Sequence, residues 1–239
     1  MRLMWAAAIA VCQAGLIMAA ENKLEDYPFW RAVAGAWRAE NTYMDRDLNY
    51  NIRSYNSVIL VEIDGRIYRE TEIKSYAPSK LAQQNGRGMT TADEGIETVT
   101  VTTGELTDDA GTVRITATVP DLLGDSNTEI RILSPDTAVR VTPNSGTGVD
   151  TYRMFVFLPV ANKRYRSNFG LVSDTTGGGA ANAASDAKLG DLRGFSLFRE
   201  DRIPQGDAEK WRAEFRAKNK VAAVVEAGLD GKPVVRRLK

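Results

Sequence analysis

Arginine, tyrosine, lysine and carboxylate side chains must supply any chemistry in this chain, because it contains no histidine and only one cysteine. Without histidine, the usual general base near neutral pH and the commonest ligand of zinc are missing. Histidine-based catalytic triads, histidine-ligated zinc and histidine-ligated haem are therefore excluded.

A first candidate site consists of Arg53, Tyr55 and Arg69, which share the strand parity of the apolar residues that we expect to point inward. A buried arginine needs a counter-charge, so on an inner sheet face these residues would bind the anionic head group of a ligand. At strand ends they would instead reach water. Tyr165 and Phe169 have the expected inner parity of a later segment. We predict that these five residues contribute to a ligand-binding site.

A second grouping occupies one face of a single predicted strand and comprises Tyr68, Glu70, Glu72, Lys74 and Tyr76. Inside a barrel this set would be an acid/base cluster capable of proton transfer. On the outside it would be a solvated strand surface. The sequence favours the outer position.

A third grouping places Lys163, Arg164 and Arg166 around Tyr165. These cations could bind phosphate or acidic polysaccharide, but a solubilising strand edge is the favoured interpretation, since edge strands commonly carry such charges. The acidic spacing at residues 45–49 resembles the start of a calcium loop, yet the glycine and final glutamate of that loop are absent. We predict neither a bound metal nor a cofactor.

Alternating segments supply the elements that position these residues. Their period of two and hairpin signals such as Asp64-Gly65 are typical of antiparallel strands. About nine or ten strands at hairpin spacing predict a mainly β fold, either a sandwich or an up-and-down barrel. An amphipathic helix is expected over about 207–228, and 232–239 could form a last short strand. Segment 174–191 lacks large side chains and should be a mobile linker or a lid.

The barrel interpretation predicts an inner lining that is apolar with a few polar tips. Its expected members are Tyr55, Ile59, Val61, Ile73, Val113, Ile115, Ile130, Ile132, Val139, Val141, Tyr165, Phe169 and Leu171. Such a lining suits a hydrophobic or amphipathic small molecule. The alternative is a solid core without a cavity, because small barrels are often filled by their own side chains.

Residues 29–37, FWRAVAGAW, place a helical turn before a Gly-x-Trp motif and a chain of strands. This arrangement resembles the opening of the calycin superfamily, which includes lipocalins, fatty-acid-binding proteins and nitrobindin-like domains. The resemblance implies a single antiparallel barrel in which Gly35 permits tight entry into the first strand and Trp37 closes one end beneath an arginine. Three residues are candidates for that arginine: Arg193, Arg199 and Arg202. The lipocalin disulfide and the haem-ligating histidine of nitrobindin-like domains are absent.

Residues 1–20 have the layout of a secretory signal, with one cation, an apolar run and small residues at the end. The run is too short for a spanning helix. We predict cleavage after Ala20, with Ala19 as the alternative position, and export, to the periplasm if the source is a Gram-negative bacterium. Cleavage removes Cys12 and leaves residues 21–239 as one barrel domain without a disulfide. Lipidation of Cys12 is the less favoured alternative, because Val11 precedes it.

The charge is balanced, with 31 basic and 31 acidic residues, and predicts no general attraction to nucleic acid or anionic membranes. We therefore predict an exported barrel, without a membrane span, that binds or carries a hydrophobic or amphipathic small molecule. One alternative is an isomerase, cyclase or lyase that transfers protons between tyrosine, carboxylate and arginine. A structural envelope module with a solid core is the other, since a fold does not decide between functions.

Overall fold

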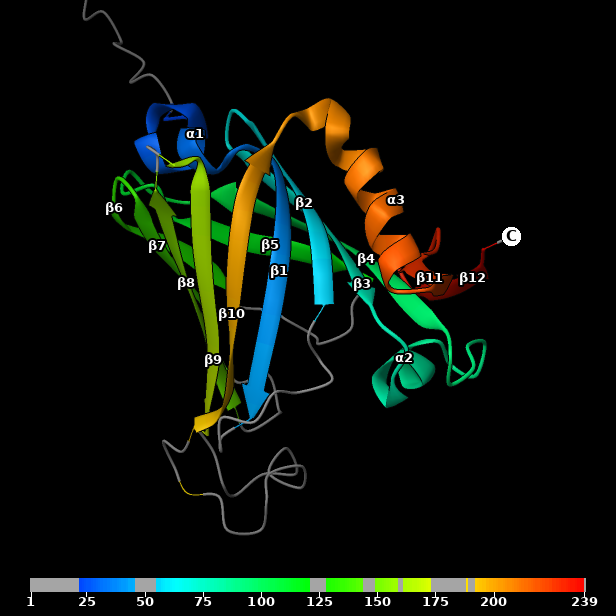
Figure 1. Ribbon diagram of the computed structural model, residues 1–239. Coiled ribbons are helices and arrows are strands. Elements are labelled where there is room, and N and C mark those ends of the chain that lie inside the picture. Colours follow the sequence, from blue (N-terminus) through cyan, green and yellow to red (C-terminus); the bar gives the residue numbers. More distant parts are fainter. Residues whose placement is uncertain are drawn as a thin grey trace, which may run out of the picture.

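Ten antiparallel strands close into an up-and-down barrel in the computed structural model of this chain (Figure 1). Each strand pairs with the next, and β1 pairs with β10 to complete the ring. The bounds are β1 Gly35–Asp45, β2 Tyr55–Asp64, β3 Ile67–Tyr76, β4 Gly95–Leu106, β5 Val113–Val119, β6 Glu129–Ser134, β7 Thr137–Thr142, β8 Val149–Leu158, β9 Lys163–Val172 and β10 Leu192–Ile203. The structure describes residues 22–45, 55–120, 128–143, 149–158, 161–172, 188 and 192–238. The predicted barrel is confirmed.

The hairpin predicted between the second and third strands forms, with Asp64 paired to Ile67. Its two turn residues are Gly65 and Arg66, one position later than the Asp-Gly signal suggests. Gly65 has φ of 58°, which glycine adopts without steric cost.

Two short helices cover one end of the barrel, η1 (Leu24–Asp26) and α1 (Pro28–Val33), shown in blue in Figure 1. Pro28 stands at the first helical turn, where its missing N–H has no partner to lose. Trp30 of α1 and Trp37 of β1 are almost fully buried, and their indole nitrogens donate to the carbonyls of Gly111 and Val33, each at 2.9 Å. This end is therefore a packed apolar core.

The described contacts place Arg202, one of the three candidate arginines, over Trp37. Its guanidinium lies 4.4 Å from the Trp37 ring and donates to the carbonyl oxygens of Ala34, at 2.8 Å, and Ala32. Gly35 has φ of 117°, and a Cβ there would lie 2.8 Å from Nη1 of Arg202. Glycine is thus required at this entry into the first strand for both backbone and packing reasons.

The C-terminal helix α3 (Ala208–Lys218) follows η4 (Gln205–Asp207) and packs on the outside of β1, β2 and β3 (orange in Figure 1). Its Phe215 meets Val58 and Ile73. The helix ends ten residues earlier than the expected end at about 228, because the Val-rich segment after Lys220 forms strand β11 (Val221–Ala227). β-branched residues favour such a pleated surface over a helix.

The remaining elements extend the sheet beyond the barrel. Strand β11 runs parallel to the first part of β4, and β12 (Pro233–Arg237) pairs antiparallel with β11, so the expected last short strand is present. A short helix, α2 (Lys80–Asn85), precedes β4. None of the helices in the described part of the chain has the length and apolarity needed to cross a membrane.

Candidate functional site

The cross-strand register determines which residues point into the barrel. Trp37 pairs with Ile59, and Ile59 pairs with Glu72. Trp37 and Ile59 are both fully buried in the core, so Glu72 lies on the inner face beside them. The same face of β3 carries Tyr68, Glu70, Lys74 and Tyr76. Placing this grouping on the outer, solvated face is therefore wrong, because its buried carboxylates find cationic partners across the barrel.

A charged layer crosses the barrel interior. Glu200 is 0% exposed and forms ion pairs with Arg164 and Arg166 of the neighbouring strand β9. Arg166 also donates through Nη2 to Oε1 of Glu72 at 2.9 Å, and Nζ of Lys74 lies 3.2 Å from the other oxygen of Glu72. Burial alone would raise the pKa of Glu72, but Lys74 and Arg166 hold that pKa below its ordinary value. Glu72 is consequently ionised at neutral pH.

Tyr68 and Glu70 form a separate pair at the packed end of this layer. The Tyr68 hydroxyl donates to Oε2 of Glu70 at 3.0 Å, and its ring lies 5.3 Å from that of Trp30. Burial and the adjacent Glu70 raise the pKa of Tyr68. Burial would also raise the pKa of Glu70, but Arg166 and other arginines bring it below its ordinary value. Tyr68 is therefore a neutral hydrogen-bond donor, and Glu70 is the charged acceptor.

Aromatic rings line the interior toward the end opposite α1. The Tyr55 ring lies 4.9 Å from Tyr76 and 6.0 Å from Phe198. Two guanidiniums face the Phe198 ring, that of Arg166 at 4.1 Å and that of Arg153 at 6.0 Å. Burial, followed by the charge of Glu72, raises the pKa of Tyr55 well above its ordinary value, so this hydroxyl remains a hydrogen-bond donor.

Several inner polar atoms have no hydrogen-bond partner among the described residues. Arg153 forms no ion pair with any described carboxylate, and Nη1 of Arg166 and Nη2 of Arg164 have no acceptor. The side-chain amide of Asn41, the hydroxyl of Ser57 and Oδ1 of Asn168 are also buried without a hydrogen-bond partner among the described residues. Buried polar groups are normally paired, so these atoms mark where a polar ligand group would be stabilised.

The structure does not bring the five predicted ligand-binding residues together on the inner face. Tyr55 points into the barrel, whereas Arg69 lies on the outer face, where its side chain is 53% exposed and 3.6 Å from Glu62. Tyr165 and Phe169 alternate with the inward Arg164 and so point outward. Their assignment to the inner face is corrected. Arg53, like the Gly-rich part of segment 174–191, falls outside the described residues.

The same reversal of parity affects other members of the expected apolar lining. Ile73 packs beneath α3 on the outside. Val139, Val141 and Leu171 also lie on the outer face. The residues that alternate with them in their strands, which are arginine, threonine and glycine, point inward instead. Ile59, Val61, Val113, Ile115, Ile130 and Ile132 belong to the core as predicted.

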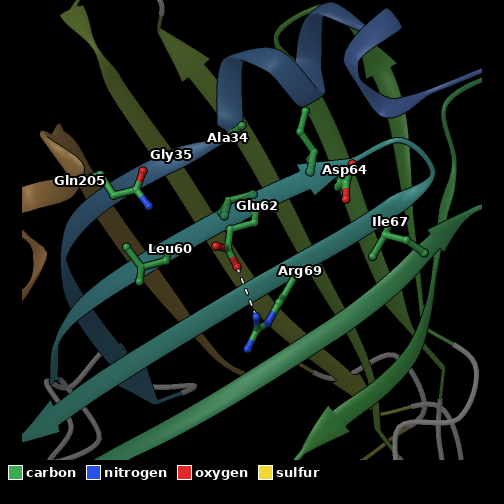
Figure 2. Close-up of a pocket in the computed structure, with 10 residues that line it drawn as sticks. Ala34, Gly35, Leu60, Glu62, Asp64, Ile67, Arg69 and Gln205 are labelled. Atoms are coloured by element: carbon green, nitrogen blue, oxygen red, sulfur yellow. Dashed lines mark ion pairs between the residues drawn. The ribbon is translucent and has the colours of Figure 1, made fainter.

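Described residues form two grooves on the outer wall. One, of about 610 Å³, runs along β2 and β3 beside Gln205, and Figure 2 shows Glu62 and Arg69 pointing toward each other within it. The other, of about 270 Å³, lies between α3 and strands β1 and β10, where Trp211 stacks against the Arg38 guanidinium at 4.2 Å. Arg69 thus belongs to an outer groove.

Sequence reasoning missed Arg153 and Glu200 as inner residues. A signal was present, because Arg153 shares its parity with the large apolar residues Phe155 and Phe157, and Glu200 shares its parity with Phe198. A charged residue in step with buried aromatic residues indicates an inward position.

Comparisons with known proteins identify no relative of this chain. No protein family, no curated protein and no solved structure matches the chain. Within the described ranges, no group of three or more acidic, histidine or cysteine side chains is placed to hold a metal ion. The site must be interpreted from its own residues.

Proposed function

We propose that this protein is an exported, calycin-like barrel that binds an amphipathic small molecule, with the anionic group of that molecule near Arg153. The observation that carries the proposal is the inward Arg153 guanidinium, which forms no ion pair with a described carboxylate and faces the same Phe198 ring as Arg166, whose Nη1 lacks an acceptor among the described residues. An unpaired cation in a partly buried site is stabilised by an anion. The rings of Tyr55 and Phe198 provide apolar area for the rest of the ligand.

Gly35, Trp37 and Arg202 support the calycin resemblance, because their contacts match what it implies for the closed end of the barrel. Export is supported by the pattern of residues 1–20. The intact mass of protein collected outside the cytoplasm tests it, with the expected mass beginning at Glu21. A mass that retains residues 1–20 contradicts export by cleavage.

Binding is favoured over proton-transfer catalysis by the ionisation of the inner groups. A general acid or base works best with a pKa near the operating pH. The pKa values of Glu70 and Glu72 lie below their ordinary value, and that of Tyr55 lies well above its own. A solid structural module is disfavoured because it would pair its buried polar atoms.

A thermal-shift series tests binding. Alkyl sulfates and carboxylates below their micelle concentrations should raise the melting temperature, whereas alkyl trimethylammonium ions of equal length should not. A ligand at one hundred times its Kd stabilises by about 2.7 kcal/mol. Arg153→Gln should weaken anion binding at least about tenfold, the effect of about 1.4 kcal/mol. Arg131→Gln is the matched control, since Arg131 is 63% exposed on the outer face. Equal shifts with cationic amphiphiles, or binding unchanged in Arg153→Gln, would contradict the proposal.

A further inference from the structure

The residues that alternate with the inner cations form an apolar surface on the outside of β7, β8, β9 and β10. Register places one cross-strand row of Val141, Tyr152, Phe169 and Phe195, and beside it a second row of Val139, Met154, Ser167 and Leu197. These two rows and Val156 are called the outer apolar face. It lies toward the end opposite α1, because Ile203 at the far end of β10 pairs with Ala36 beside α1, whereas Phe195 and Leu197 lie near the other end of that strand.

The outer apolar face is accessible. Leu197 is 45% exposed and Met154 39% exposed, and the Tyr152 and Phe169 rings stack at 5.4 Å. The strands that helix α3 mainly contacts are β1, β2, β3 and β11, none of which carries the outer apolar face. A contiguous apolar surface with this many large side chains indicates an interaction site.

The backbone beneath this face presents no unpaired strand edge. Each of β7, β8, β9 and β10 has a hydrogen-bonded neighbour on both sides. Addition of a partner strand is therefore excluded here, because it needs free N–H and C=O groups. A surface whose backbone polar groups are satisfied can instead enter a lipid interface at little cost.

The polar boundary of the face has the composition of a membrane interface. One step toward α1, Tyr165 lies between Val156 and Arg199 in the register. Tyrosine prefers the boundary between apolar and aqueous layers. Arg199 is paired with Glu40 at 2.7 Å, so this described part of the boundary carries little net charge. Apolar contact, not attraction to anionic lipids, is then the driving force.

The shape of the face favours a bilayer over a second copy of the chain. A closed barrel has a convex wall, and two convex walls touch along a narrow strip. A stable dimer needs about 800 Å² buried on each partner. A bilayer deforms around a convex surface. We propose that the outer apolar face docks on the surface of a phospholipid bilayer. This goes beyond the proposed function, and it would bring the barrel end near Arg153 close to a source of amphipathic molecules.

Cosedimentation with phosphatidylcholine vesicles tests the docking, using the exported protein. The variant Met154→Ser/Leu197→Ser should bind at least about tenfold more weakly, a loss of about 1.4 kcal/mol. The isosteric pair Val139→Thr/Val141→Thr provides a second variant that preserves strand propensity. Leu133→Ser is the control, because Leu133 is 60% exposed on β6, outside the outer apolar face. Salt of about 0.5 M, which screens exposed charges, should leave binding unchanged.

Absence of vesicle binding overturns the proposal, as does equal loss in Leu133→Ser. Binding that requires anionic lipids and disappears in salt also overturns it. Concentration-dependent self-association that the Met154/Leu197 variant abolishes would instead assign the face to a second copy. Binding of alkyl sulfate in vesicle-free solution should be unchanged in this variant, so failure of docking is distinguishable from failure of ligand binding.

Discussion

Glu200→Gln perturbs the charged layer at its centre while changing side-chain volume very little. Glu200 is 0% exposed, accepts a hydrogen bond from Arg164 and forms an ion pair with Arg166, and both arginines are themselves buried. Removing its charge leaves two guanidiniums sharing the remaining carboxylates. Breaking a buried ion pair in this way costs about 3–5 kcal/mol. For a chain of this size that corresponds to a fall in melting temperature of roughly 6–20 °C.

The adjacent residue provides a matched comparison. Arg199 precedes Glu200 on β10 and points outward, where it pairs with Glu40 at 2.7 Å, and both side chains are more than half exposed. Exposed pairs contribute about 0–1 kcal/mol, so Glu40→Gln should change stability by no more than that. Urea unfolding at pH 7, with the slope m checked for constancy, measures both losses.

A loss below about 1 kcal/mol in Glu200→Gln would refute this reasoning, because it would mean that Glu200 is hydrated or unpaired. Equal losses in the two variants would also refute it. Either result would show that the inner and outer faces of β10 are not as different as the register implies.

Two further predictions concern Gly35, at the entry into the barrel, and Glu97 of β4, which forms ion pairs with α3. Gly35→Ala should destabilise the protein by about 1–3 kcal/mol in thermal unfolding, because φ of 117° is strained for alanine and its Cβ would press on Arg202. Gly206→Ala, where no neighbouring atom lies within 4 Å, should change stability by less than about 0.5 kcal/mol. Burial would raise the pKa of Glu97, but hydrogen bonds from Arg216 and Arg212 of α3 hold it below its ordinary value. The stabilisation from Glu97 is therefore complete above pH 4.5 and is lost as pH falls further, and Glu97→Gln should flatten stability measured over that range. Stability that rises on acidification in the parent protein, or an unchanged pH dependence in Glu97→Gln, would contradict this account.

Alternation in the sequence determined which residues share a face of each strand, and the resulting ten-strand antiparallel barrel is confirmed. The set from Tyr68 to Tyr76 does occupy one face of β3, as the period of two requires. Gly35 and Trp37 also indicated the closed end correctly, because a positive φ and a buried indole are local requirements.

Which face points inward was decided only by the tertiary structure. Both faces of this barrel carry apolar residues, so hydrophobicity favoured the wrong side for Tyr165, Phe169 and the carboxylates of β3. Closure of the ring brings Arg166 against Glu72, which lies 94 positions away, and that pairing makes an inward glutamate stable. The alternation within a strand shows which of its residues share a face, but it does not show which residues of other strands they contact. The charge complementarity that places Glu72, Arg166 and Glu200 inside exists only after the barrel has closed.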